Sequence, residues 1–549
     1  MPFSSLHHFS PLHATGRSLR LTALIGSVAF WMSIGVACGP SPSGSHDAST
    51  ERDSGALPDA DASVDSRSIE DGGLISDGAA ARDGNTIQDG GSTADGQTFC
   101  DELDDPNELI ADRRFRRGFI PLDQDTHAPS GVMPTGFCQE SPIWDIAQWD
   151  SLGDLSQSTR ETLPSGSVRW SNQYGSVTVG LLDNLDETDI SFAVWAYQEY
   201  GGQYHTPTPD RVWVHLLAEQ RISPPGVQRQ GCPPLSALAS LHFSMYAQLL
   251  KDEPHHQSGY DPNKHAAQFL LYFTVQNLNP NSNGFPDYLW FGITPYDDRY
   301  DIVPPYIQGD LSGAMGTGKL IYNLGGEPFI TVGLTPQGPE QLFAKDILPD
   351  IRQALLEAWS RGYLPDSKVL SDYRIGGMNI GWEVPGLNDV EMRVRDLSLR
   401  YERRPVTPVA FEFNHDGDRE GWTAVNMTDS NSGPTNGRWI LLVPGTDPHL
   451  ISPTLNLQAA THPTLHVIVA NDHNPSASSV FQVYWERFGE PGFREAWSVS
   501  TPISNGGNWQ TLDIDLSANP EWRGEITRIR IDPVQSGDNH SIGIDRIAL

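Results

Sequence analysis

The chain has 549 residues and a formal net charge of −33, because 69 Asp and Glu outnumber 36 Lys and Arg. Binding to a phosphate backbone requires clustered Lys and Arg, so this charge argues against nucleic acid as a partner and mildly against a polyanionic substrate. Outside its C-terminal region the sequence also contains no metal-ligand cluster, phosphate-binding loop or nucleophile elbow.

The N-terminus has the pattern of an export signal. Arg17 and Arg20 precede an apolar run from 21 to 37, and small residues then lead to Cys38. This arrangement resembles the signal peptide of bacterial lipoproteins, although Gly35 stands where that family usually has Leu. A short membrane helix is the alternative, but the run is near the lower limit for spanning about 30 Å of hydrocarbon. The resemblance implies a protein exported to the bacterial cell envelope, on the outer membrane or cell surface, that contacts the membrane only through a lipid on Cys38.

The segment after the predicted lipidation site has the composition of a disordered linker. Residues 39 to 99 are rich in Gly, Ser, Ala and Asp and contain few large apolar side chains. Such a segment cannot bury enough apolar surface to offset its chain entropy. Its Asp-Gly units lack the alternating Asp spacing of a calcium loop. As a flexible coil it would reach about 40 to 45 Å.

The four cysteines cannot all form disulfides if one of them is lipidated, because three thiols then remain. Lipidation of Cys38 leaves Cys100, Cys138 and Cys232 for an oxidising exterior. We expect a disulfide between Cys100 and Cys138, which flank the start of the folded region. Cys232 is then expected to be free and buried.

The remaining length predicts two domains. Roughly 450 residues exceed one ordinary core and suit two. Prolines at 405 and 408 mark a joint, because proline cannot extend a strand ladder. The predicted organisation is signal peptide 1–37, disordered acidic linker 38–99, first domain 100–402, linker 403–408 and second domain 409–549.

Alternating apolar and polar residues dominate the first domain. This period of two predicts antiparallel strands near Ser191–Glu199, Arg211–Glu219, Ala266–Gln276, Tyr288–Asp298 and Asp389–Leu399. Helical spacing of Ile351, Ala354, Leu355 and Ala358 predicts one helix over 350–359. The fold class is therefore all-β: two antiparallel β-sandwich (jelly-roll) domains after a disordered acidic linker.

The second face of these strands is aromatic and polar rather than simply charged. The candidate binding residues on it are Trp195, Tyr197, Trp213, His215, Gln268, Tyr272, Gln276, Trp290, Tyr296 and Asp298. Aromatic rings stack on sugar rings, while amides and carboxylates pair with hydroxyls, so this face suits a glycan chain. A second core covered by loops is the alternative. Residues 165 to 400 resemble, in architecture only, the concanavalin-like β-sandwiches of lectins and several glycoside hydrolase families.

The C-terminal domain carries a more specific pattern. Strands are predicted near 411–413, 438–443, 463–470, 479–487, 509–515, 525–532 and 541–549. An opening Asp-Gly-x-x-Glu-Gly-Trp over 416–422 and the closing Ile544-Asp545 resemble carbohydrate-binding and galactose-binding-like jelly rolls. That resemblance implies a structural calcium ion, for which the matching oxygen donors are Glu412, Asp416, Asp418 and Asp545. An Asp-Gly turn without metal is the alternative.

The tryptophans of this domain are the candidates for stacking on sugar rings. These candidate sugar platforms are Trp485, Trp497, Trp509 and Trp522, whereas Trp422 and Trp439 are expected in the core.

Glycosidic cleavage needs two carboxyl groups on one cleft, about 5 Å apart for retention and about 6.5 to 9.5 Å for inversion. The candidate catalytic residues are Glu199 and Glu383, with Glu219 in reserve. The alternative is that they bind hydroxyls or pair with Arg211, Arg393 and Arg395. A lyase is a further alternative, with Tyr204, His205, His215 and Arg211 as base and cation.

Three functions are therefore open. The first is a cell-surface lipoprotein that recognises polysaccharide through both sandwiches, with catalysis by the first sandwich as an open alternative. The second is a glycoside hydrolase or polysaccharide lyase with an accessory carbohydrate-binding module. The third is a non-catalytic adhesion or envelope structural protein.

Overall fold

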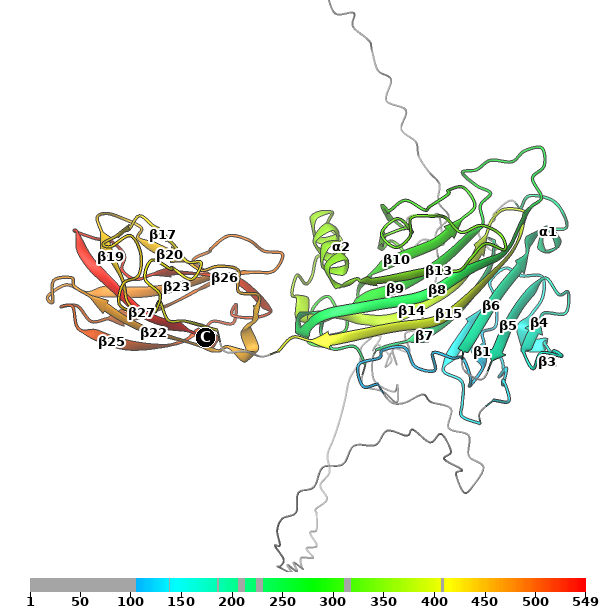
Figure 1. The fold of residues 1–549 in the computed structure, drawn as a ribbon, viewed down its shortest axis with the longest axis horizontal. Coiled ribbons are helices and arrows are strands. Elements are labelled where there is room, and N and C mark those ends of the chain that lie inside the picture. The colour runs from blue at the N-terminus through cyan, green and yellow to red at the C-terminus, as the bar shows by residue number, and fades with distance from the viewer. Residues whose placement is uncertain are drawn as a thin grey trace, which may run out of the picture. The chain divides into compact units, whose positions relative to one another are not determined.

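The folded part of the chain is built almost entirely of strands (Figure 1). The structure, a computed structural model, describes residues 105–137, 139–184, 187–205, 213–223, 231–310, 317–405 and 409–549. The predicted signal peptide, Cys38, the linker, Arg211 and the Cys100–Cys138 pair lie outside these residues. Cys232 is buried and forms no disulfide within the described part. No helix among the described residues is long and apolar enough to span a bilayer.

The first sandwich contains one sheet of eight strands and one of seven. The eight-stranded sheet has the spatial order β1 (Phe119–Pro121), β2 (Trp144–Ala147), β7 (Val214–Arg221), β14 (Tyr373–Val384), β9 (Gln268–Asn277), β10 (Tyr288–Asp297), β12 (Leu320–Asn323) and β11 (Tyr306–Gly309). The seven-stranded sheet has the order β13 (Gln341–Asp346), β8 (Leu238–Pro254), β15 (Asn388–Arg403), β6 (Glu187–Trp195), β5 (Val177–Asn184), β4 (Val168–Ser171) and β3 (Glu161–Thr162). Most pairings are antiparallel, as predicted, but β1 with β2 and β10 with β12 are parallel.

One hydrophobic core fills the space between these two sheets. Phe269 and Trp382 from one sheet pack in the same core as Phe192 and Met392 from the other. Trp382 Nε1 donates to the carbonyl of Phe192 at 2.8 Å, which satisfies the one polar atom of that buried ring. Helix α2 (Leu348–Ser360) packs against β8 and β10, and buries the four apolar residues whose spacing predicted it.

Strand parity predicted β7, β9 and β15 correctly. Their apolar faces enter the core through Leu216, Leu271 and Met392, each fully buried. The prediction for Ser191–Glu199 was wrong at its end, because β6 stops at Trp195 and the short helix α1 (Ala196–Glu199) follows. The prediction placed Glu199 on the same strand face as Trp195. Because the backbone is helical from Ala196 to Glu199, side chains no longer alternate there and this placement does not hold.

A register shift in β10 overturns a second parity prediction. The pairing of β10 with β9 is interrupted between Ile293 and Tyr296, next to Pro295. Tyr296 consequently joins the core instead of lying beside Trp290, and its hydroxyl donates to Asp252 at 2.5 Å. Proline cannot donate to a ladder, so a bulge at this position is the physical cause of the shift.

The second sandwich contains two six-stranded sheets around a separate core. One sheet has the order β18 (Thr428–Asp429), β19 (Trp439–Val443), β27 (His540–Ala548), β22 (Thr464–Asn471) and β25 (Trp509–Asp515), with β16 (Ala410–Phe411) also on β27. The other has β17 (Thr423–Val425), β20 (His449–Ile451), β26 (Glu525–Asp532), β23 (Ser479–Arg487) and β24 (Ser498–Ile503), with β21 (Leu457–Gln458) also on β26. All seven predicted strands are present, and the short β17, β18, β20, β21 and β24 were missed.

The tryptophans of this domain divide differently from the prediction. Trp422 and Trp439 are in the core, as expected. Three of the four candidate sugar platforms are also core residues: Trp485, Trp497 and Trp522. Trp509 is 36% exposed, and the guanidinium of Arg438 lies 4.9 Å from its ring.

Candidate functional site

Strand register assembles a row of polar side chains on the outer face of the eight-stranded sheet. Residues that alternate with the core positions must point to this face. Paired positions on six neighbouring strand pairs align Asp145, Glu219, Asn379, Tyr272, Gly292, Asn323 and Tyr306. A second row, four residues further along β14, aligns His215, Glu383, Gln268 and Asp297. Both rows combine carboxyl, amide and aromatic groups on one surface.

Several of these side chains are buried without a hydrogen-bond partner. Asn379 and Glu383 are each 1% exposed. Among the described residues, the buried side-chain atoms that lack a partner include both Oδ1 and Nδ2 of Asn379, Oε1 of Glu219, Oε1 of Glu383 and Nε2 of His215. Buried polar atoms are almost always hydrogen-bonded in native proteins, and each unpaired one costs about 1 to 3 kcal/mol. Several such atoms on one face are typical of a ligand site.

His215 and Glu383 form the most polar corner of this face. Nδ1 of His215 lies 2.7 Å from the carbonyl of Trp213, so Nδ1 carries the proton and Nε2 is the free acceptor. This Nε2 is 3.8 Å from Oε1 of Glu383, which is beyond hydrogen-bond range. Trp213 Nε1 donates to Oε2 of Glu383 at 3.4 Å, and the Trp213 ring stacks on that of His215.

Burial keeps both groups neutral near pH 7. It raises the pKa of Glu383 to about 8, against a smaller lowering by the Trp213 hydrogen bond. It lowers the pKa of His215 to about 4, against a smaller raising by the bond to the Trp213 carbonyl. The close approach is therefore between a carboxylic acid and a neutral imidazole, and is not a salt bridge. A hydroxyl placed between them could accept from one and donate to the other.

Glu219 lies opposite Asp145 across β7 and β2. Burial, reinforced by the charge of Asp145, raises the pKa of Glu219 well above its usual range, and Arg221 offsets part of the rise. Burial also raises the pKa of Asp145 to about 6, again offset in part by Arg221. Burial therefore favours the protonated form of Glu219.

Aromatic residues continue the first row. The hydroxyls of Tyr272 and Tyr306 are 2.8 Å apart, and Asn323 Nδ2 donates to Thr294 Oγ1 at 2.9 Å. The Tyr272 ring lies across Gly292, where an added Cβ would stand 2.4 Å from both Tyr272 and Asn323. A side chain at this position would displace the ring, so the glycine fixes the surface of the site here.

Asp297 is a site residue that the sequence reasoning missed. It is 1% exposed and pairs with the guanidinium of Arg299, Nε to Oδ1 at 2.8 Å. Gln268 Nε2 also donates to its Oδ2 at 2.7 Å. The shift in β10 puts Asp297, and not the predicted Asp298, on the face with Gln268. Asp298 instead accepts from the backbone N–H of Ala267 at 2.9 Å. The signal that could have found Asp297 was Pro295 inside the predicted strand.

The structure does not group all the predicted residues. Trp213, His215, Gln268, Tyr272, Gln276, Trp290, Glu219 and Glu383 belong to the eight-stranded sheet or its edge. Trp195 and Tyr197 belong to the end of β6 and to α1, where Lys251 lies 4.6 Å from the Trp195 ring and the His255 ring lies tilted against that of Tyr197, with centroids 4.6 Å apart.

Glu199 has the contacts of a structural residue. Its Oε1 accepts from Ser151 Oγ at 3.0 Å and from Ser176 Oγ, and its Oε2 accepts from the backbone N–H of Leu152 at 2.6 Å. These bonds hold α1 to the loop after β2. Of the three carboxyl groups predicted to be catalytic, Glu383 and Glu219 therefore lie on the polar face and Glu199 does not.

The four predicted calcium ligands are not gathered around one point. Glu412 pairs with Arg546 at 2.8 Å, while Asp416 and Asp418 accept backbone N–H groups from Asn436 and Glu420. Among the described residues, two groups of three acidic or His side chains have ligand atoms within 4.8 Å, namely His473, Asp538 and His540, and Glu253, His255 and Asp389. Calcium binding therefore stays a prediction.

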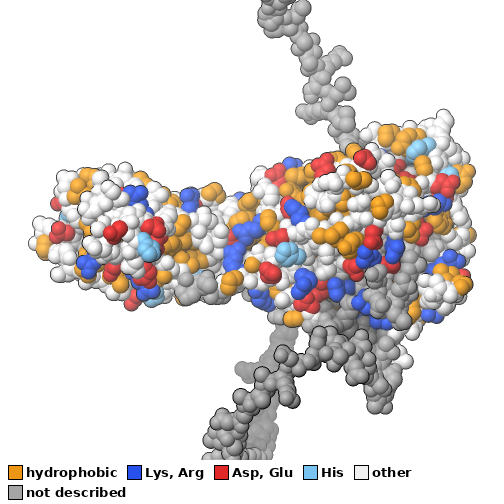
Figure 2. All heavy atoms as spheres, in the orientation of Figure 1, with side chains coloured by type: hydrophobic (Ala, Val, Ile, Leu, Met, Phe, Trp, Pro, Cys, Tyr) orange, Lys and Arg blue, Asp and Glu red, His pale blue; other side chains and the backbone are white. Residues whose placement is uncertain are grey.

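Acidic and basic side chains are interspersed over the described surface that Figure 2 presents, without a broad patch of one sign. In the polar rows, burial keeps Glu383 protonated near pH 7, and Asp297 is paired with the guanidinium of Arg299. The electrostatics of the face thus suit an uncharged ligand better than a polyanion.

Comparison with known proteins gave only remote likenesses. No protein-family model matches the chain, and no curated protein matches it. Among solved structures, an endoglucanase from Rhodothermus marinus is similar at 9% identity, covering 45% of this chain and 97% of the other, with a TM-score of 0.25. A family 11 carbohydrate-binding module from Clostridium thermocellum is similar at 14% identity, covering 27% and 96%, with a TM-score of 0.20. A tandem of family 22 modules from Paenibacillus barcinonensis is similar at 12% identity, covering 72% and 98%, with a TM-score of 0.22. At these identities and TM-scores we base no conclusion about this chain on the likenesses.

Proposed function

We propose that the chain binds an uncharged polysaccharide on the outer face of its eight-stranded sheet. The observation that carries the proposal is the group of buried polar atoms without partners, on Asn379, Glu219, Glu383 and His215. Native proteins seldom leave such atoms unpaired unless a ligand, ion or water pairs with them. Vicinal sugar hydroxyls both donate and accept, so they complement an amide, a protonated carboxyl group and a neutral imidazole together.

The aromatic residues supply the apolar half of the same interaction. Trp213 covers the His215 and Glu383 corner, and Trp290 packs edge-on to Tyr272 with ring centroids 6.0 Å apart. Rings of this kind contact the C–H faces of pyranoses while the polar groups take the hydroxyls. Because the unpaired atoms are buried, a glycan reaches them only when the side chains that cover them move, and at the His215 and Glu383 corner that side chain is Trp213.

Replacing Asn379 by Leu tests the proposal through two opposite effects. The variant removes two unpaired buried polar atoms at similar volume, so we expect it to raise the free energy of unfolding by about 1 to 3 kcal/mol. The same change should weaken glycan retention by about tenfold or more, because the amide contacts to hydroxyls are lost. Denaturant unfolding and affinity electrophoresis on a panel of plant, algal and bacterial glycans measure the two effects.

Asn277→Leu is the matched control. Asn277 is equally buried on β9, but its Nδ2 donates to Ser282 Oγ at 2.7 Å and its Oδ1 accepts from the backbone N–H of Asn279 at 3.2 Å. We expect this variant to be destabilised by about 1 to 3 kcal/mol. Equal destabilisation by both substitutions, with glycan retention unchanged in Asn379→Leu, would show that Asn379 is a structural residue and contradict the proposal.

Glycoside hydrolysis at this face is the second candidate function, and the protonation state of Glu383 favours it. A general acid must hold its proton near the working pH, and a pKa of about 8 meets that condition. Asp297, held as an ion pair by Arg299, lies in the same row with one strand, β9, between them. Two strand spacings place their backbones about 9.5 Å apart, with Gln268 of β9 between them, and a carboxyl separation of about 6.5 to 9.5 Å would favour inversion.

Calcium binding in the second sandwich has a separate test. If Glu412, Asp416, Asp418 and Asp545 hold Ca²⁺, EGTA should lower the melting temperature of the second sandwich, and added CaCl₂ should restore it. Differential scanning calorimetry of the whole chain measures this. A melting temperature that EGTA leaves unchanged would contradict calcium binding and would support the turn alternative.

A further inference from the structure

Strand register places two histidines opposite each other at one end of the second sandwich. The antiparallel pairing of β22 with β27 joins Ala470 to Gly543 and Asn471 to Ile542. The backbone N–H of Asp472 then donates to the carbonyl of Ser541 at 2.9 Å. Continuing this register sets His473 directly opposite His540. Side chains at such positions lie on the same face, with Cβ atoms about 4.5 to 5.5 Å apart.

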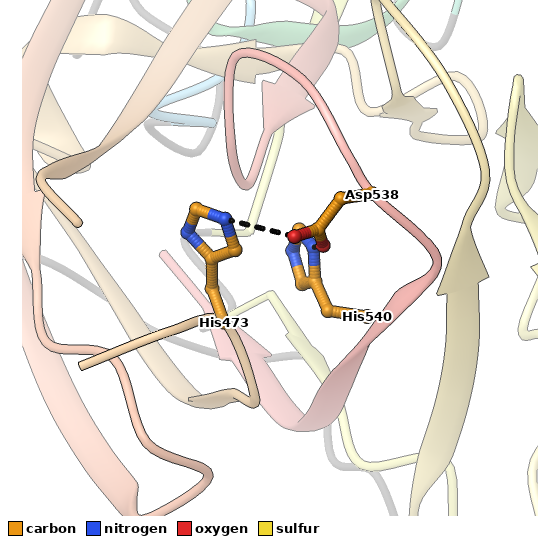
Figure 3. A group of neighbouring side chains, drawn as sticks. All are labelled: His473, Asp538 and His540. Carbon is orange, nitrogen blue, oxygen red and sulfur yellow. Dashed lines mark hydrogen bonds and ion pairs between the residues drawn. The ribbon is translucent and has the colours of Figure 1, made fainter. Parts of the chain in front are cut away.

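A carboxylate completes the group. Asp538 precedes His540 by two residues, and its Oδ1 is 2.9 Å from His540 Nδ1. Its Oδ2 is 3.6 Å from Nε2 of His473, and the two imidazole centroids are 4.5 Å apart. Figure 3 shows His473 facing Asp538 and His540 across a short gap. One ligand atom from each of the three residues lies within 4.8 Å of the others.

The contacts inside this group leave coordination positions free. The 3.6 Å separation of His473 Nε2 and Asp538 Oδ2 is too long for a hydrogen bond. It is close to the distance of about 3.3 Å between two ligands that share one tetrahedral ion at about 2.0 to 2.1 Å. His540 is 8% exposed, and its Nε2 is buried with no hydrogen-bond partner. His473 Nδ1 is near Ser479 Oγ, at 3.3 Å, which orients its Nε2 toward Asp538.

From this geometry we propose that His473, Asp538 and His540 bind a divalent transition-metal ion such as Zn²⁺. Two imidazoles and one carboxylate are borderline ligands that suit Zn²⁺ and related first-row ions, whereas Ca²⁺ and Mg²⁺ prefer oxygen donors alone. With three protein ligands, water completes the coordination. The ion would tie the end of β22 to the loop before β27, which is a structural role separate from the glycan face.

Two other His–carboxylate groups in the described part of the chain lack this combination. His466 and Asp513 form an exposed pair at 2.6 Å with a single imidazole. In the group of Glu253, His255 and Asp389, the imidazole bonds directly to Asp389 at 3.1 Å and Lys251 pairs with Glu253 at 3.0 Å. These contacts are satisfied without an ion. The contraction needed at His473, Asp538 and His540 is small, and the Asp538 side chain, which is 66% exposed and bonds to His540, can shift without displacing core side chains.

Zinc titration of the full-length, chelator-treated chain tests the proposal. Isothermal calorimetry should show one Zn²⁺ site that Asp538→Asn and His473→Ala each weaken about tenfold or more. Co²⁺ should give the visible absorption bands of a tetrahedral nitrogen and oxygen site, and a tenfold excess of CaCl₂ should not displace it.

His466→Ala is the control variant, because it removes an imidazole of the same sandwich that also contacts a carboxylate. Zinc affinity should be unchanged in this variant. Asp538→Asn alters an exposed side chain, so loss of binding there cannot be attributed to unfolding when its melting temperature matches the parent's. Absence of zinc binding, or equal affinity in the parent, His473→Ala and Asp538→Asn, would overturn the assignment.

Discussion

Replacing Glu383 by Gln should lower the rate of saccharide release by about 10² to 10⁴-fold, if the outer face of the eight-stranded sheet hydrolyses the glycan it binds. Gln keeps the shape of the side chain but has no acidic proton for the leaving oxygen. Glycan retention should fall far less, because the Gln amide still reaches hydroxyls. Reducing-end release at saturating substrate, beside binding of the same polymer, separates the two effects.

The pH profile gives a second readout of the same residue. Because the active form of a general acid is protonated, the parent rate should fall as the pH rises through the Glu383 pKa of about 8. Glu357→Gln is the matched control, since Glu357 lies on α2 and pairs with Arg361 at 2.6 Å, away from the polar rows. Full activity in Glu383→Gln would rule out hydrolysis through this acid, and glycan binding without release from the parent would leave a binding protein.

The sequence was a reliable guide wherever strands alternate without interruption. The apolar positions of β7, β9 and β15 all enter the core because the period of two directly encodes which face is buried. Trp213, His215 and Gln268 were found by the same argument, whereas Glu383 was a candidate outside the strands that alternation predicted. Parity failed where the backbone changes, at the turn from β6 into α1 and at the bulge beside Pro295. One misplaced residue there exchanges the two faces, which removed Tyr296 from the site and hid Asp297.

Local sequence patterns could not predict which strands, distant in the sequence, pair with each other in the sheets. Asn379 became visible as a site residue only because β14 lies between β7 and β9. That position sets its amide beside Glu219 and Tyr272. In the second sandwich His473 and His540 are likewise separated in sequence and meet only through the β22–β27 register. A single sequence contains the residues of both sites but not the alignment that brings them together.

The free energy of unfolding should fall as the pH rises from about 6.5 to 8, and Glu383 should be a main cause. Its pKa is about 8 in the folded state and near the ordinary 4.5 when unfolded, so the folded state binds the extra proton between these values. The contribution of Glu383 to the free energy of unfolding is therefore fully present below pH 4.5. It is lost progressively up to pH 8, by on the order of 4 to 5 kcal/mol in all.

His215 has the opposite effect on stability, because its folded pKa of about 4 lies below the ordinary 6.5. Its contribution grows as the pH rises from 4 to 6.5, which offsets the loss from Glu383 in that range.

Guanidinium unfolding of the parent and of Glu383→Gln, each at pH 6.5 and at pH 8, isolates the Glu383 contribution, because other groups that titrate in this range, such as unfolded His215 and folded Asp298, are present in both proteins. The parent should lose about 2 kcal/mol between these pH values through this group, since each pH unit corresponds to about 1.36 kcal/mol. Glu383→Gln carries no titrating group at this position. Between pH 6.5 and pH 8, its free energy of unfolding should therefore fall by about 2 kcal/mol less than that of the parent. Glu357→Gln should keep the parent's dependence, because Glu357 pairs with Arg361 on the surface of α2. Identical pH dependence in the parent and Glu383→Gln would mean that the Glu383 carboxyl group is already ionised in the folded protein, and the same result would remove the basis for its role as a general acid.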